Sequence, residues 1–446
     1  GWIEIGEAQI AVNIAKATGA TLHLSGDYDA GELGENVADD ALLMAAPAFA
    51  NVGQFGIASR LIAEIGPRSH LLADPAIAAS LQAIMGAARR VRESLELADA
   101  LDRSADPGIR ETSIFFTLPA LRHSASLTVP EKELQKKTLR RRIVRRRQAG
   151  DGPGEAREKV NLANLHRGRG EGEKAIRLYR EAAEADPDYL ERAYYWRELG
   201  GVLWMGRRYG EAAEAYEKAI SLGAPPITGA LHADSVLFTG RYRQALEELE
   251  KFNAEHPDLA AEYRLKEIAL RVIVEQMGIE TQERDTDGAV RASPDVGNGA
   301  SPEQVIEGSL TQLRLDALWP SAWYNVGIAE GRRGDGRAAL KAFLAATTMM
   351  PGFDLEPWSH AAFWAWRLGE ADLLRDILAT ARRLAGAPIL AEMIRFGRSQ
   401  DEGLPRDGLL EAVGDILDEM PPDARAGYTI RVAGPDGVEE FEVGES

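Results

Sequence analysis

Alanine residues recur in this chain at a nearly constant spacing, each inside a helix-like apolar pattern. Ala175, Ala212 and Ala245 each precede a large apolar residue by four positions, and successive alanines lie 37 and 33 residues apart. A fourth copy occurs at Ala339. A repeat of about 34 residues is typical of stacked helix–turn–helix units, which bury their apolar faces against their neighbours. The spacing therefore predicts an α-solenoid, an architecture that usually presents a surface for binding.

The unit from Ala193 to Pro226 shows how this pattern specifies two packed helices. Both helix faces carry large apolar residues at helical spacing, and Gly206 interrupts the chain between them. The small residues Gly200 and Ala212 allow the two helices to approach closely. The apolar positions are Trp196, Leu199 and Leu203 on the first face, and Tyr209, Tyr216 and Ala219 on the second.

Three further stretches repeat this register. The matching positions are Leu162, Ala163, Ala175, Tyr179, Ala182 and Pro187 in 156–189, Ala233, Tyr242, Ala245, Phe252 and Pro257 in 226–259, and Trp323, Gly327, Ala339, Phe343, Ala346 and Pro351 in 320–353. Together the four copies resemble the tetratricopeptide repeat (TPR) family, whose signature is W-x2-L-G-x2-Y, then A-x3-F, then P. The resemblance implies a TPR-like superhelix over 156–385 that binds a protein or peptide.

The repeat pattern is looser between the third and fourth copies. Ala260–Met277 is predicted to be a first helix and Pro302–Leu318 to be its partner. Ser301 is the predicted N-cap of that partner, and Gln304 completes a capping box. The segment 278–300 is rich in Gly, Asp, Ser and Pro, so we expect a mobile surface insertion.

The chain before residue 131 matches no family pattern. Val37–Ile65 and Pro75–Leu101 are predicted to be helical. Strands are predicted at Ala20–Ser25, Ile114–Leu118 and Ala125–Val129. We therefore expect residues 1–130 to be mostly helical with a few strands.

The C-terminal part extends and then closes the predicted array. Leu355–Ala385 is predicted to be a further, divergent unit, and Asp407–Met420 an amphipathic helix that caps the solenoid. Tyr428–Ala433 and Val438–Val443 alternate around a Gly-Pro-Asp-Gly turn, which predicts a β-hairpin. The expected fold is predominantly α, with regions at 1–130, 131–155, 156–400 and 401–446.

Composition excludes several classes of protein. The 446 residues carry a net charge of −18, which argues against general coating of DNA, and they include no cysteine, which excludes disulfides and thiol catalysis. The sequence has no apolar run of 18 residues and no visible signal peptide. We expect a cytoplasmic protein that does not insert into membranes.

A strongly basic stretch runs from Glu131 to Arg147 and carries a local net charge of +7. The Gly-rich stretch after it, Gln148–Glu155, is the best candidate for a domain boundary. The basic residues either bind a polyanion such as nucleic acid or dock on the chain's own acidic surface; no aromatic residue interleaves them for base stacking. The candidate polyanion-binding residues are Lys136, Lys137, Arg140, Arg141, Arg142, Arg145, Arg146 and Arg147.

The TPR resemblance also implies where a partner binds. In that family, ligand contacts come mostly from the first helix of each repeat. Carried over by register, the candidates are Arg157, Asn164, Arg167, Tyr194, Arg197, Trp204, Tyr324, Ile328, Phe363 and Trp366. Val160 and Glu198 occupy positions where the chaperone-binding members carry Lys and Asn, so binding of an acidic C-terminal tail of the EEVD type is not expected.

Apparent catalytic and metal signals are better explained as structure. Gly168–Lys174 resembles a phosphate loop but lacks the Walker spacing, and it falls where a repeat needs its inter-helix turn. Asp27, Asp29 and Glu32 are too common a surface pattern to specify a cation, and Asp285 opens an incomplete calcium loop. No HExxH or G-x-S-x-G motif is present, so we predict no catalytic residue, metal or cofactor.

The leading functional hypothesis is a non-catalytic adaptor, scaffold or regulatory subunit that binds a protein or peptide in its concave groove. One alternative is a recognition arm fused to an N-terminal effector or ligand-sensing domain, as in bacterial signalling or defence systems. A second alternative is a regulator that binds nucleic acid or another polyanion through 131–147.

Overall fold

The computed structural model describes residues 35–51, 53–117, 127–259, 261–285, 299–349, 354–386, 388–401, 403–404, 428–434 and 437–443. The chain divides into two compact units, Gly1–Tyr195 (unit 1) and Trp196–Ser446 (unit 2). Nearly all of the described structure is helical, and helix α11 (Ala193–Met205) crosses the division.

Unit 1 is an array of short antiparallel helices. Its elements are α2 (Glu35–Asn51), α3 (Phe55–Ile65), η1 (Gly66–Arg68), η2 (His70–Ala73), α4 (Pro75–Ala87), α5 (Val91–Asp102), α6 (Pro107–Thr112), η3 (Phe115–Thr117), α8 (Val129–Gln148), α9 (Gly152–Arg167), α10 (Gly172–Ala185) and η5 (Pro187–Glu191). The helices expected over 37–65 and 75–101 are present as pairs. Each pair turns at a residue with positive φ, Gly53 (78°) in the first and Arg89 (53°) in the second.

The strand predicted at Ile114–Leu118 is wrong, because this run forms a helical turn over Phe115–Thr117. Phe116 is fully buried in the core formed by α2 to α6. With helices around it and no neighbouring strand, the run satisfies its own backbone: the Thr117 N–H donates to the Ile114 carbonyl at 3.0 Å. The Ser94 hydroxyl donates to the Phe116 carbonyl at 2.8 Å.

The strand predicted at Ala125–Val129 is also wrong where the structure describes it. Val129 is the first residue of α8, and Thr128 is the N-cap. The Thr128 N–H donates to the Glu131 carboxylate at 2.7 Å, so the two residues form a capping box. The strand predicted at 20–25 and the acidic residues Asp27, Asp29 and Glu32 lie outside the described residues.

The Gly-rich stretch after α8 is a tight turn between two packed helices. The Asp151 N–H donates to the Arg146 carbonyl at 3.0 Å, and the Asp151 carboxylate caps α9 by accepting from the Gly154 N–H at 2.9 Å. Helices α8 and α9 pack against each other. The division between the two compact units falls after Tyr195.

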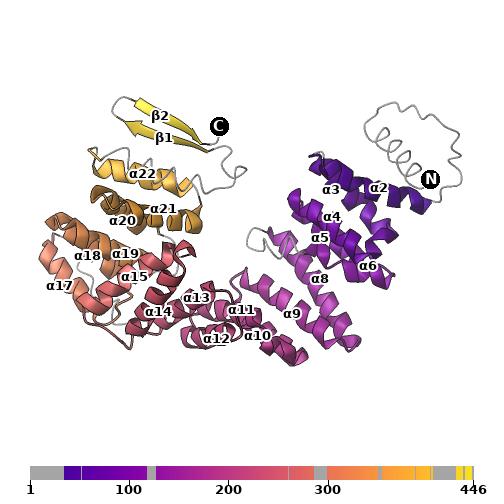
Figure 1. Cartoon of the computed structure of the whole chain (residues 1–446), viewed down its shortest axis with the longest axis horizontal. Helices are drawn as coiled ribbons and strands as arrows, with labels where there is room; N and C mark the ends of the chain where they lie inside the picture. Colours follow the sequence, from indigo (N-terminus) through magenta and orange to yellow (C-terminus); the bar gives the residue numbers. More distant parts are fainter. Residues whose placement is uncertain are drawn as a thin grey trace. The chain divides into compact units, whose positions relative to one another are not determined.

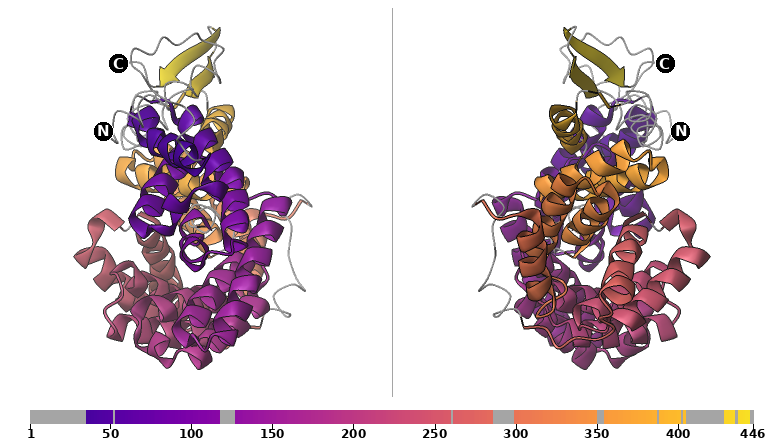
Figure 2. Two further views of the ribbon diagram at one scale, coloured as in Figure 1. Left: turned by 90° about the vertical axis from the view of Figure 1, so that its right-hand side faces the viewer. Right: turned by 90° about the vertical axis from the view of Figure 1, so that its left-hand side faces the viewer.

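In unit 2, the helices from α12 to α14 lie side by side in chain order (Figures 1 and 2). Its elements are α12 (Tyr209–Ser221), α13 (Ile227–Phe238), α14 (Tyr242–Glu255), η6 (Pro257–Leu259), α15 (Ala261–Arg271), η7 (Val272–Gln276), α17 (Pro302–Leu313), α18 (Pro320–Arg333), α19 (Gly336–Thr348), α20 (Leu355–Arg367), α21 (Ala371–Ala385) and α22 (Pro388–Gln400). Thus the helices of the predicted repeats are present.

The helix pairing predicted between the third and fourth copies is wrong. The main partner of α17 is α18, whereas α15 packs against α14, α19 and α21. A π-helical turn, η7, ends α15 and carries the buried residues Val272, Ile273 and Val274 into the core. The capping box predicted for α17 is present: the Ser301 N–H donates to the Gln304 side chain at 2.9 Å.

The first part of the predicted mobile insertion is anchored, so that prediction is wrong for 278–285. The Gln282 N–H donates to the Gly240 carbonyl at 2.9 Å, and the Asp285 N–H donates to the Leu315 carbonyl at 3.0 Å. The Arg284 guanidinium lies 2.6 Å from the Asp316 carboxylate, which is fully buried. Residues 286–298 lie outside the described residues.

The C-terminal hairpin consists of β1 (Tyr428–Gly434) and β2 (Gly437–Val443), which pair antiparallel with Tyr428 opposite Val443. β1 lies next to α22. The capping helix predicted at Asp407–Met420 lies outside the described residues.

Candidate functional site

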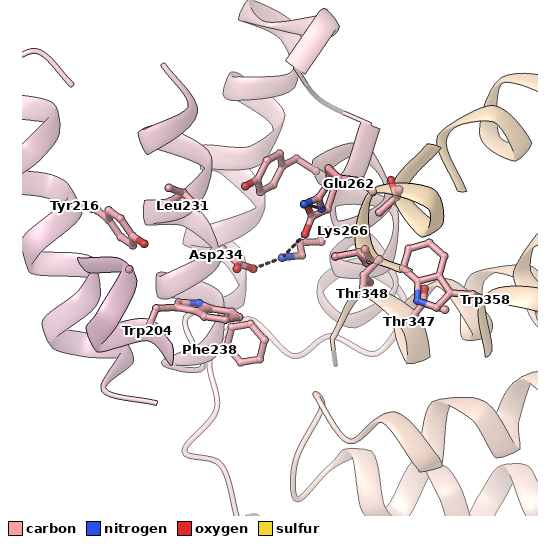
Figure 3. Close-up of a pocket in the computed structure, with 15 residues that line it drawn as sticks. Trp204, Tyr216, Leu231, Asp234, Phe238, Glu262, Lys266, Thr347, Thr348 and Trp358 are labelled. Atoms are coloured by element: carbon pink, nitrogen blue, oxygen red, sulfur yellow. Dashed lines mark hydrogen bonds and ion pairs between the residues drawn. The ribbon is translucent and has the colours of Figure 1, made fainter. Parts of the chain in front are cut away.

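A cavity of about 460 Å³ opens within unit 2 (Figure 3). Helices α11, α13 and α15, which are the first helices of three successive repeats, form one side of the cavity. Helices α19, α20 and α21 contribute to the rest. Its lining residues are Gly201, Trp204, Tyr216, Leu231, Asp234, Phe238, Glu262, Tyr263, Lys266, Thr347, Thr348, Trp358, Thr380, Arg383 and Leu384. The repeat geometry thus places side chains that are distant in sequence around one space.

Aromatic rings form one wall of the cavity. The Trp204 ring meets the Phe238 ring edge-on with centroids 5.6 Å apart, and Tyr209 stacks on Phe238 at 4.8 Å. The Trp204 indole Nε1 is buried and has no hydrogen-bond partner among the described residues. An unpaired buried donor is costly, so this N–H is available for an acceptor on a bound molecule.

A buried cation occupies the middle of the cavity. Figure 3 shows Lys266 between Asp234 and Glu262, with the Lys266 Nζ 2.6 Å from the Asp234 carboxylate and 3.5 Å from that of Glu262. Burial opposes charge on this amine, but the two carboxylates prevail and raise the pKa of Lys266. Glu262 also pairs with Arg383, so the two acidic and two basic side chains balance.

The opposite wall supplies apolar surface and hydroxyl groups. Figure 3 shows Thr347, Thr348 and Trp358 on this side. The Thr348 hydroxyl donates to the Leu344 carbonyl at 2.7 Å, so it is already satisfied inside its own helix. The buried Thr380 hydroxyl has no partner among the described residues. A guest here would meet a mostly apolar surface with a few hydrogen-bonding groups, which is the usual character of a binding site.

The acidic side chains of the cavity are engaged by basic side chains. Within the described ranges, no group of three or more His, Cys, Asp or Glu side chains could hold a metal ion. The carboxylates of Asp234 and Glu262 are held by Lys266 and Arg383, and none of the lining residues forms a nucleophile–base pair.

The predicted contact residues of the first repeats lie in unit 1. Arg157 and Tyr194 are partly exposed, and Tyr194 meets the Tyr189 ring edge-on with centroids 6.0 Å apart. Asn164 accepts a hydrogen bond from the Tyr179 hydroxyl, and Arg167 is half-buried.

The remaining predicted residues lie in unit 2, and the cavity includes only Trp204 of them. Arg197 pairs with its neighbour Glu198 at 3.0 Å. Tyr324 and Ile328 are half-buried, and the Tyr324 hydroxyl donates to Glu356. Phe363 and Trp366 are each 6% exposed and belong to the core of α20 to α22, so they contribute packing and little accessible surface.

The tetratricopeptide repeat family model matches residues 155–223, which span α9 to α12. This part of the chain belongs to the tetratricopeptide repeat family. Repeats of this class generally mediate protein–protein interactions. No curated protein sequence matches the chain.

Solved structures of tetratricopeptide repeat proteins are similar to this chain at low identity. One is YrrB, described as a TPR protein with an unusual peptide-binding site (18% identity, 47% of this chain and 92% of that one, TM-score 0.28). Another is a tetratricopeptide repeat protein from Parabacteroides merdae (14% identity, 76% and 98%, TM-score 0.32). A third is the TPR2AB domain of yeast Sti1 in complex with an Hsp90 peptide (14% identity, 58% and 98%, TM-score 0.24).

The charged residues at the centre of the cavity were not among the predicted contact residues, although the TPR spacing contains a signal for them. Asp234 lies on α13 and Lys266 on α15, 32 residues later, close to one repeat length. Residues one repeat apart face each other across neighbouring first helices. Opposite charges at this separation, both in otherwise apolar helix faces, were the available clue.

The basic helix α8 docks largely on acidic side chains of unit 1. Arg141 and Arg145 both pair with Asp102, at 3.1 and 2.7 Å. Arg142 is fully buried and lies 2.9 Å from Glu158. The other pairs are Lys136 with Glu133, Arg146 with Glu111 and Asp151, and Arg147 with Glu155. The structure thus favours internal docking for most of these residues and leaves Lys137 and Arg140 exposed.

The described part of the N-terminal region is helical. The Gly168–Lys174 stretch spans the turn between α9 and α10, with Gly170 at φ 73°, and the first residues of α10. None of the described helices combines the length and apolar character that crossing a membrane requires.

Proposed function

We propose that this TPR protein is a non-catalytic adaptor or scaffold, and that unit 2 holds a segment of a partner protein in the cavity between α11, α13, α15 and α21. The single observation that carries the proposal is that side chains from the first helices of three successive repeats line one cavity of about 460 Å³. Aromatic anchors in well-packed pockets supply much of the energy of protein interfaces. Trp204 and Phe238 supply such a surface here.

The chemistry of the cavity indicates what kind of segment fits. Because Asp234, Glu262, Lys266 and Arg383 neutralise one another, the cavity favours no strongly charged group. An aliphatic or aromatic side chain would pack on the rings. A backbone carbonyl of the partner would accept a hydrogen bond from the Trp204 indole N–H, which no described residue pairs with.

The proposal is tested by photo-cross-linking with the full chain. A photoreactive amino acid at Leu384, which lines the cavity and is 43% exposed, should capture a partner. The same amino acid at Leu259, which is 52% exposed and outside the cavity, is the matched control. Quantitative mass spectrometry then identifies the proteins that are enriched at position 384 alone.

The captured partner is then purified and its affinity for variants is measured. Trp204→Phe keeps an aromatic ring but removes the indole donor, and we expect it to weaken binding about tenfold. Met205→Ala changes an exposed neighbour on the same helix and should leave the affinity unchanged. If Trp204→Phe has no effect while alanine at Arg197 and Tyr324 abolishes binding, the partner uses another surface and the cavity assignment fails.

A further inference from the structure

A second cavity, of about 430 Å³, lies in unit 1. Its lining residues are Arg140 of α8, Leu162 and His166 of α9, and Lys174, Arg177, Leu178 and Glu181 of α10. With 3.6 residues per turn, Leu162 and His166 project from the side of α9 opposite to Arg157 and Asn164. This cavity therefore belongs to a different surface from the one on which the TPR resemblance places ligands.

Positive charge dominates the lining. Arg140, Lys174 and Arg177 are exposed cations, and Glu181 is the one carboxylate among the described lining residues. The Glu181 carboxylate is already shared, since it lies 3.7 Å from the Lys159 Nζ and 3.9 Å from the Arg177 Nε. Lys174 pairs with Glu171 at 2.8 Å but keeps 56% of its side chain exposed.

Arg140 distinguishes this cavity from the rest of the basic helix. Arg141, Arg142 and Arg145 on the same helix are committed to carboxylates of unit 1. Arg140 makes no ion pair with any residue in the described ranges, and it lines the cavity. A cation that the fold leaves unpaired at the rim of a cavity is available to an anionic guest.

The floor of the cavity favours a peptide over a nucleic acid. Leu162 and Leu178 provide apolar surface, and none of the described lining residues is Phe, Tyr or Trp on which a base could stack. A short acidic segment with an aliphatic side chain matches both the charge and the apolar floor.

We propose that this cavity binds an acidic peptide segment of a partner protein. Carboxylates of the segment pair with Arg140, Lys174 and Arg177, and an aliphatic side chain packs on Leu162 and Leu178. The site is independent of the cavity in unit 2, so the protein carries two docking surfaces of different chemistry.

The test uses the full chain and a fluorescein-labelled synthetic peptide of repeated Glu-Glu-Leu triplets, with binding followed by fluorescence anisotropy at low salt. Arg140→Glu should weaken binding about tenfold or more. The matched control is Lys137→Glu, which makes the same charge change at an exposed residue one turn away that does not line the cavity. It should change the affinity by less than roughly twofold, as expected for a screened surface charge.

Further measurements test whether the cavity binds an acidic peptide or another ligand. A peptide in which Gln replaces Glu should not bind, and Trp204→Phe in unit 2 should leave the affinity for the acidic peptide unchanged. Equal losses for Arg140→Glu and Lys137→Glu would show general electrostatic attraction and overturn the proposal, as would absence of binding. Tighter, Arg140-dependent binding of a single-stranded oligonucleotide would overturn the choice of a peptide.

Discussion

Gly327 lies directly against the ring of Phe343, so closely that a β-carbon on Gly327 would lie 2.8 Å from the Phe343 Cε1 atom. Gly200 and Tyr216 repeat the relationship 127 residues earlier, at 2.9 Å. In both cases a glycine of a first helix faces an aromatic ring of the second. The ring fills the space that the missing side chain leaves, and this sets how closely the two helices approach.

Replacement of Gly327 by alanine should therefore destabilise unit 2. The fully buried Phe343 ring cannot retreat without moving its neighbours. We expect a loss of about 1–3 kcal/mol in the free energy of unfolding, the usual cost of overpacking a core. Chemical denaturation followed by circular dichroism measures the change as a lower denaturation midpoint.

Gly229→Ala is the matched control, because Gly229 is also in a first helix but a β-carbon there would lie 4.0 Å from Phe252, at ordinary contact distance. It should leave the protein unchanged or stabilise it by about 0.4–1 kcal/mol, since alanine restricts the unfolded chain. Similar midpoints for Gly327→Ala and Gly229→Ala would show that the glycine–ring contact does not limit packing.

The buried cation in the cavity leads to an asymmetric prediction. Lys266→Met leaves Asp234 buried without its cation, and the cost is expected to be about 3–5 kcal/mol. Asp234→Leu should cost less, because Lys266 keeps Glu262 at 3.5 Å. The double variant should be more stable than Lys266→Met alone, because the uncompensated charge is gone. Denaturation midpoints of the two single variants and the double variant measure this. Additive losses would contradict it.

These glycine–ring contacts explain why the repeats could be predicted from sequence. The small residue in the first helix and the ring in the second recur at a fixed separation, so the sequence of each repeat specifies how its two helices pack. Local signals were equally informative at the start of α17, where Ser301 and Gln304 form the predicted capping box.

Contacts between residues far apart in the chain could not be predicted in this way. Arg264 of α15 bonds to Asp376 of α21 at 2.6 Å, across 112 residues. Such contacts turn α15 toward α19 and α21, whereas the local pattern suggested α17 as its partner. The strand predicted at Phe115 and Phe116 was wrong for a related reason. A short buried segment becomes a strand only where another strand can pair with it.

The imidazole of His360 should make unit 2 sensitive to acid. Its ring stacks on Phe343 with centroids 4.6 Å apart and meets Tyr324 and Phe396 edge-on. Burial lowers the pKa of His360 to about 4, against a weaker opposing effect of Glu356. The unfolded chain therefore binds more protons than the folded chain between about pH 6.5 and pH 4, so stability is lost as the pH falls through this range.

The measurement is the shift of the thermal midpoint between pH 7 and pH 5. From the shifted pKa, the loss that is specific to His360 should be about 2 kcal/mol at pH 5. His360→Phe keeps a ring in the same place but cannot titrate, so its midpoint should fall less over this range. An unchanged difference between pH 7 and pH 5 in the variant would contradict the assignment to His360.

Two arginines two positions apart on α8 should differ strongly in how much their substitution destabilises the protein, although sequence alone groups them in one basic run. Arg142 is fully buried, 2.9 Å from the fully buried Glu158, and burial lowers the pKa of Arg142. Arg142→Met removes the closer cation from the fully buried Glu158 and leaves only the longer contact with Arg157 at 3.7 Å, so we expect unit 1 to lose about 3 kcal/mol. Arg140→Met removes an exposed cation and should change stability by less than about 0.5 kcal/mol.

Adding Glu158→Leu to Arg142→Met should recover much of the loss. Hydrogen exchange at α8 and α9 reports these changes locally, and equal effects of the two arginine substitutions would mean that the basic run acts as one undifferentiated surface.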